Sequence, residues 1–63
     1  MLYLVTFQAH TGRAAETIEA DGHGHEAGGT SVVFRSLQRV AFTDREVVVR
    51  RLDAASVQTI TPA

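Results

Sequence analysis

Short, closely spaced runs of β-branched residues constrain the fold of this chain more than any other feature. Two such runs, residues 31–34 and 47–49, flank a polar corner at residues 43–46, and a third run follows at residues 56–60. Residues of this kind favour strands. Strands this short cannot bury their apolar faces singly, so we expect a small sheet that is closed or stacked on itself.

Alternation along the chain predicts the remaining strands. Residues 2–9 are apolar at both odd and even positions, which is typical of a strand covered on both faces. Residues 15–20 alternate, with Ile18 on one side and Thr17 on the other. The Asp21-Gly22 pair is a hairpin signal, so we expect residues 23–26 to return beside this strand.

The second half of the chain leaves one alternative open. Apolar residues between positions 32 and 42 share a parity, which predicts one bent strand, with a short helix over residues 36–41 as the competing prediction. Asp53 is placed to cap a 3₁₀ turn over residues 54–56 that leads into the last strand. The run Arg-Leu-Asp-Ala-Ala-Ser-Val-Gln-Thr-Ile at residues 51–60 thereby resembles the end of an SH3-like small barrel.

We therefore predict a single all-β domain over residues 1–63 with five or six antiparallel strands. The expected architecture is an SH3-like small barrel with a 3₁₀ turn before the last strand, and a simple meander is the alternative. The predicted core consists of Leu4, Val5, Phe7, Ile18, Val32, Phe34, Val40, Phe42, Val48, Leu52, Val57 and Ile60.

The chain combines a Tyr-Leu-Val-Thr-Phe opening, a Glu-Thr-Ile-Glu-Ala-Asp strand, a Val-Phe strand and an Ala-Ser-Val ending. In this combination the whole chain resembles short proteins of actinobacteria and their phages that have no assigned activity. It implies a bacterial or phage origin and no particular functional residues.

The small size of the domain suggests a function through association. A 63-residue chain buries only about 60% of the surface that its unfolded form exposes, and it has no cysteine for a disulfide. Residues 2–5 and 47–52 nevertheless carry apolar groups on both faces. We expect a non-enzymatic protein–protein interaction or self-assembly module whose partner is itself, as a homo-oligomer, or another protein. The predicted interface residues are Leu2, Leu4, Val47 and Val49.

Catalysis, cofactors and membranes are not expected. No nucleophile, general base and orienting carboxylate occur at a spacing typical of a catalytic site, and the glycines lack the Lys-Ser/Thr pair of a phosphate-binding loop. The apolar start, residues 1–7, is far shorter than the roughly 20 residues of a membrane span. The absence of a membrane span and of cysteine predicts a cytoplasmic protein. The absence of a catalytic spacing predicts that the protein is not an enzyme.

All six basic residues are arginines, and several fall on neighbouring predicted strands. A basic stripe of this kind holds single-stranded nucleic acid or other anions in some small barrels. The alternative is that the arginine stems cover apolar sheet while their heads pair with Glu16, Glu19, Asp44 or Glu46. A net charge of −1 places nucleic acid behind protein as the expected partner. The stripe would consist of Arg35, Arg39, Arg50 and Arg51.

His23-Gly24-His25 is the one cluster with metal-ligand character. Residues two apart in a strand point to the same face, so both imidazoles are able to reach one Zn²⁺, Ni²⁺ or Cu²⁺ ion. Glu26 or His10 would supply a third ligand. A solvated hairpin without metal is the alternative.

Overall fold

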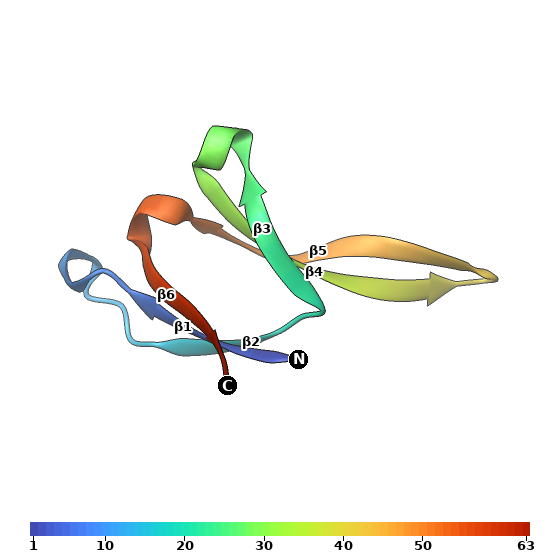
Figure 1. The fold of residues 1–63 in the computed structure, drawn as a ribbon, viewed down its shortest axis with the longest axis horizontal. Helices are drawn as coiled ribbons and strands as arrows, with labels where there is room; N and C mark the ends of the chain where they lie inside the picture. Colours follow the sequence, from blue (N-terminus) through green and yellow to red (C-terminus); the bar gives the residue numbers. More distant parts are fainter.

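The computed structural model describes residues 1–63 as six strands and three 3₁₀ turns, without an α-helix (Figure 1). The all-β prediction is confirmed. The strands are β1 (Leu2–Phe7), β2 (Glu16–Glu19), β3 (Gly22–Glu26), β4 (Ser31–Val40), β5 (Thr43–Asp53) and β6 (Val57–Pro62). The 3₁₀ turns are η1 (Ala9–Thr11), η2 (Ala27–Gly29) and η3 (Ala54–Ser56). The predicted turn before the last strand is confirmed, and the Asp53 carboxylate caps it by accepting from the Ala55 N–H at 3.2 Å.

The strands form two antiparallel three-stranded sheets, in the orders β2-β1-β6 and β3-β4-β5. In the first sheet Leu4 of β1 lies between Thr17 and Thr61. In the second sheet Val33 of β4 lies between Gly24 and Arg51. No strand pair joins the two sheets, so the expected barrel is not closed. A simple meander is also wrong, because β6 returns to pair with β1.

The barrel stays open because the two sheets overlap only in part. Closure requires the edge strands of a sheet to be hydrogen-bonded to each other. β2 has four residues and passes into β3 through Ala20 and Asp21, which lie in neither strand. β5 pairs with β4 alone, and its first half extends away from the rest of the molecule (Figure 1).

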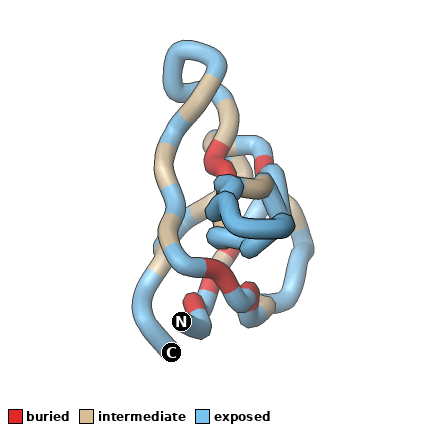
Figure 2. The backbone as a smooth tube through the Cα atoms, turned by 90° about the vertical axis from the view of Figure 1, so that its right-hand side faces the viewer, coloured by how far each residue is buried: buried red, intermediate tan, exposed pale blue.

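The core lies where the inner faces of the two sheets meet. Buried and exposed residues alternate along β1, which puts Tyr3, Val5 and Phe7 inside. Figure 2 marks the buried stretches of the backbone in red. Six members of the predicted core are buried: Val5, Phe7, Ile18, Val32, Phe34 and Leu52. Val57 and Ile60 are half-buried against them. Tyr3, Ala20 and Val33 are buried without having been predicted.

Four predicted core residues are exposed. Leu4 lies on the outer face of β1, because its neighbours Tyr3 and Val5 point inward. The other three lie where β4 and β5 continue beyond the first sheet, so no second layer covers them. These are Val40, Phe42 and Val48.

The ends of β4 and β5 form a two-stranded arm, defined here as residues 36–49. β3 pairs with β4 only up to Arg35, so beyond that point β4 has β5 as its single neighbour. The reversal is a two-residue turn at Ala41 and Phe42, and not the predicted corner at residues 43–46. The alternative helix over residues 36–41 is wrong. The arm gives the chain a radius of gyration of 12.8 Å, against roughly 11 Å for a compact chain of this length.

Asp21 carries the chain from one sheet to the other. The predicted Asp21-Gly22 hairpin is wrong, because β2 and β3 belong to different sheets. The Asp21 N–H donates to the carbonyl of Arg35 at 2.8 Å, and its Oδ2 accepts from the N–H of Leu37 at 2.7 Å. The backbone N–H and the carboxylate of Asp21 thus both form hydrogen bonds to β4, at the base of the arm.

Candidate functional site

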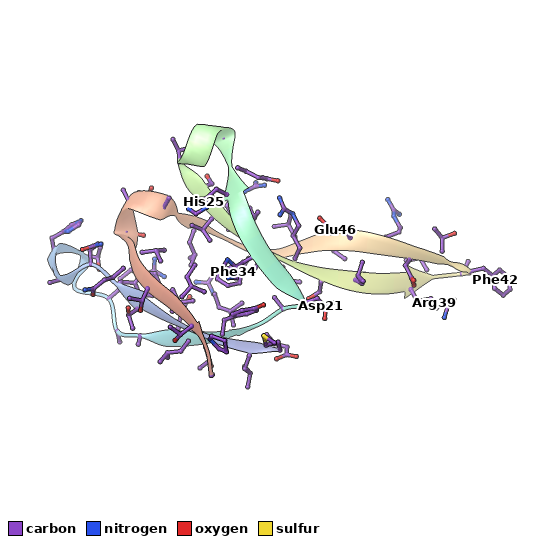
Figure 3. All side chains as sticks on the ribbon, viewed as in Figure 1. Asp21, His25, Phe34, Arg39, Phe42 and Glu46 are labelled. Carbon is purple, nitrogen blue, oxygen red and sulfur yellow. The ribbon has the colours of Figure 1, made fainter.

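The arm carries the most exposed apolar surface of the molecule. Figure 3 shows Phe42 at the tip of the arm. This residue is 96% exposed, and Leu37 is 62% exposed. Val40, Val48 and Val49 are each close to half exposed. Together these five residues expose on the order of 500 Å², divided between the two faces of the arm, because Leu37 shares the parity of Arg35 and Val40 does not. Two strands alone cannot cover either of their faces, so the exposure follows from the extension of the hairpin.

The predicted interface residues fall on two separate surfaces. Leu2 and Leu4 lie on the outer face of the first sheet, where Leu4 is flanked by threonines on both neighbouring strands. Val47 and Val49 lie on the arm; Val47 is half-buried, and Val49 is the extra residue of a bulge opposite Phe34 and Arg35. The structure therefore does not join the four into one patch.

The predicted arginine stripe is divided between two faces and the arm. Arg35 and Arg51 lie on the outer face of the second sheet, where both donate to the Glu26 carboxylate, at 2.7 and 2.9 Å. Arg35 Nε also lies 3.1 Å from Glu46 Oε1. Val33 lies directly opposite Arg51 and two residues before Arg35 on β4, and it is fully buried. The aliphatic stems of the two arginines therefore cover the apolar surface of the sheet here.

The Glu26 carboxylate is held between two arginine side chains. Hydrogen bonds from Arg35, and then from Arg51, lower the pKa of its carboxyl below 4.5. A carboxylate between two guanidinium groups accepts charge-assisted hydrogen bonds, which favour its ionised form. Glu26 was not among the partners expected from the sequence.

The other two arginines of the stripe also face carboxylates. Arg50 points to the inner face and lies 2.8 Å from Glu16 Oε1 of the first sheet, although without the alignment of a hydrogen bond. Arg39 lies 3.9 Å from Asp44 across the arm. Three of the four expected partners, Glu16, Asp44 and Glu46, are thus confirmed, whereas Glu19 pairs with the N-terminal amine of Met1. The stripe offers little uncompensated charge to a phosphate backbone.

The histidine cluster does not assemble a metal-ligand set. His23 and His25 share the inner face of β3, and the His23 ring packs edge-on against Tyr3, 5.0 Å between centroids. Glu26 points to the opposite face. His10 lies in η1, after β1. Within residues 1–63 no group of three or more His, Asp or Glu side chains is placed to hold a metal ion.

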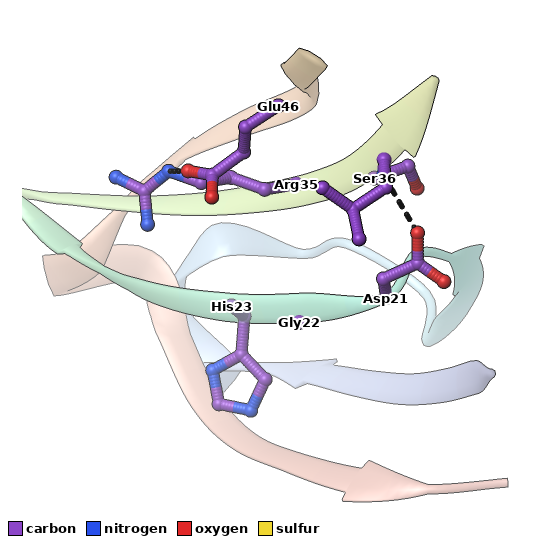
Figure 4. A pocket seen from close by; sticks show the side chains of 7 residues that line it. Asp21, Gly22, His23, Arg35, Ser36 and Glu46 are labelled. Carbon is purple, nitrogen blue, oxygen red and sulfur yellow. Dashed lines mark hydrogen bonds and ion pairs between the residues drawn. The ribbon is translucent and has the colours of Figure 1, made fainter. Parts of the chain in front are cut away.

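A polar hollow of 280 Å³ lies at the base of the arm (Figure 4). Its lining includes Asp21, His23, Arg35, Ser36 and Glu46. The Asp21 carboxylate and the Arg35–Glu46 pair are already engaged with β4 and with each other, as the dashed lines in Figure 4 mark. No hydrogen bond joins Ser36 to His23, so the hollow holds no nucleophile–base pair.

The exposure of the arm tip was not predicted from the sequence. Phe42 and Val40 were assigned to the core because they share a parity with Val32 and Phe34. Arg45 is also on the arm and is the one arginine of the chain without a carboxylate within 4 Å. Three consecutive charged residues at positions 44–46 put charge on both faces of the strand, and this was the available signal for an uncovered ribbon.

Comparisons with family models, curated proteins and solved structures find no match to this chain. The resemblances stated above therefore stay predictions. No helix of residues 1–63 has the length and apolar character that a bilayer crossing requires.

Proposed function

We propose that this protein is a non-enzymatic interaction module that contacts its partner through the β4–β5 arm. The observation that carries the proposal is Phe42, a large aromatic side chain held 96% exposed at the end of a hairpin. Aromatic residues are enriched at protein–protein interfaces and act there as anchors. Burying this side chain would contribute about 1.5–3 kcal/mol.

The energetics of a two-stranded ribbon support the same proposal. An isolated hairpin is marginally stable in water, because neither face is packed. The arm shows this condition over residues 36–47, where β4 and β5 have no third strand beside them. A partner that covers one face or one edge would stabilise the arm as it binds.

The SH3-like relationship is part of this proposal. Its support is the strand order, in which β2 and β3 follow one another like two halves of one bent strand, each in a different sheet. The 3₁₀ turn η3 before β6 is a second point of support. On this proposal the protein is an opened small barrel whose long hairpin has been turned outward for binding.

Photo-cross-linking tests the function directly. Phe42→p-benzoylphenylalanine keeps an aromatic ring at the tip and captures whatever lies against it in cells that express the protein. The same group at Thr17, on the outer face of the first sheet, is the control. We expect adducts from position 42 and few from position 17. Equal yields from the two positions, or none from position 42, would show that the arm is not the contact surface.

A further inference from the structure

β5 leaves one backbone edge unpaired along its length, because β4 is its only neighbour. Such an edge presents N–H and C=O groups that a further strand is able to bond. Residues 43–48 contain neither proline nor glycine, and their ladder with β4 is regular up to the bulge at Val49. Extended peptides bind to sheets by adding a strand to an edge of this kind.

The charged side chains of this edge are divided between the two faces of the arm. Arg45 lies opposite Gln38, which alternation along β4 puts on the inner face together with the buried Phe34. Asp44 and Glu46 lie on the outer face. The edge therefore presents a positive charge on one face and two negative charges on the other.

Arg45 is the one charge of this edge that the chain leaves without a counter-charge. On the outer face, Glu46 lies 3.1 Å from Arg35, and Asp44 lies 3.9 Å from Arg39. None of the ion pairs of the chain includes Arg45. An arginine on an open edge, beside a free backbone ladder, is placed to meet a carboxylate on an added strand.

A second copy of β5 does not supply this carboxylate. When two β5 strands pair antiparallel through their free edges, residues opposite each other lie on the same face in both copies. All three acidic residues of β5 lie on the outer face, whereas Arg45 lies on the inner face. The complementary charge therefore comes from a strand of different sequence.

We infer, resting on the function proposed for the arm, that its partner is a different protein, which adds an extended strand to β5 with a carboxylate residue opposite Arg45. The residues on either side of this carboxylate lie opposite Glu46 and Asp44, where basic side chains are favoured. The residue two positions away lies opposite Val47, where a β-branched side chain packs. Because charges along an edge oppose pairing with uncomplementary strands, the same pattern makes the edge selective.

Two peptides of identical composition test the inference. In antiparallel orientation, Val-Val-Lys-Glu-Lys-Thr sets its glutamate opposite Arg45 and its lysines opposite Glu46 and Asp44. The control peptide Val-Val-Glu-Lys-Lys-Thr has the same net charge, but it sets a lysine opposite Arg45 and its glutamate opposite Glu46. In amide NMR titrations of the full chain, we expect the first peptide to shift resonances of residues 43–48 and to bind about fivefold more tightly than the control.

Charge reversal in the protein is the matched experiment. Arg45→Glu should remove the preference between the two peptides, because the glutamate of the first peptide then meets a like charge. Arg39→Gln changes an arginine of the same arm on its outer face and should leave the preference unchanged. Equal binding of the two peptides to the unchanged chain, or the same preference in Arg45→Glu, overturns the role of Arg45.

The remaining outcomes separate this inference from the function on which it rests. If neither peptide binds while position 42 cross-links to a different protein, the added strand is overturned and the arm remains an interaction surface. Adducts at position 42 that join two copies of this chain overturn the different partner. An oligothymidylate that shifts residues 43–48 when neither peptide does overturns a protein partner in favour of nucleic acid. Absence of both peptide binding and adducts overturns the inference and the proposed function together.

Discussion

Phe34 and Phe42 are a matched pair for testing the fold, because the same residue type has opposite environments. Phe34 is fully buried and packs against Tyr3 and His23, at 5.8 and 5.7 Å between ring centroids. Removing a buried phenylalanine side chain costs about 3–5 kcal/mol, including the cavity left behind. A 63-residue domain has a total free energy of unfolding of roughly 3–9 kcal/mol. Phe34→Ala should therefore lose most of the stability of the fold.

Phe42→Ala should change the free energy of unfolding by less than about 0.5 kcal/mol, because its side chain loses almost no contacts. Urea unfolding followed by circular dichroism measures both variants, at two protein concentrations so that any dimer contribution is recognised by its concentration dependence. A loss above about 2 kcal/mol for Phe42→Ala in dilute protein, or a mild effect of Phe34→Ala, would refute this assignment of the core.

Three further predictions concern local features. Because Arg35 and Arg51 lower the pKa of Glu26 below 4.5, its carboxylate stabilises the fold at neutral pH, and this contribution is lost as the pH falls through the lowered pKa. Glu26→Gln should therefore flatten the acid side of the pH dependence of urea unfolding, and identical profiles would contradict the contribution. Ala41 has a φ of 57°, so Ala41→Gly should raise the free energy of unfolding by about 1 kcal/mol, whereas Ala55→Gly, at an exposed position without positive φ, should not; equal effects would remove the strain argument. Excess Zn²⁺ or Ni²⁺ should leave the melting temperature unchanged, because Glu26 faces away from His23, and a chelator-reversible rise would show that a metal site forms after all.

Local patterns predicted which segments are strands but not which of them lie over the core. The β-branched runs and the Asp53 cap are properties of neighbouring residues, and β4, β5, β6 and η3 form where these patterns occur. Parity along a strand is also local, and it placed Phe34 and Phe42 on the same side. Burial depends on how far the opposite sheet extends, which the parity of residues along a single strand does not encode.

The candidate site was predictable to a similar extent. Pairing of the arginines with Glu16, Asp44 and Glu46 follows from charge alone and is confirmed. The role of Glu26 depends on the β3–β4–β5 register, because only that register sets it beside both Arg35 and Arg51. Asp21 was predicted to be a turn residue. Its backbone and carboxylate contacts with β4 could not be predicted, because they depend on how the two sheets are placed.

Tyr3 gives the molecule a built-in optical reporter. It is the single tyrosine of a chain without tryptophan, so ultraviolet emission from the native protein originates at one ring. The Tyr3 ring lies between the two sheets, edge-on to the His23 imidazole and beside Phe34. Separation of the two sheets therefore changes the emission intensity of an unlabelled sample.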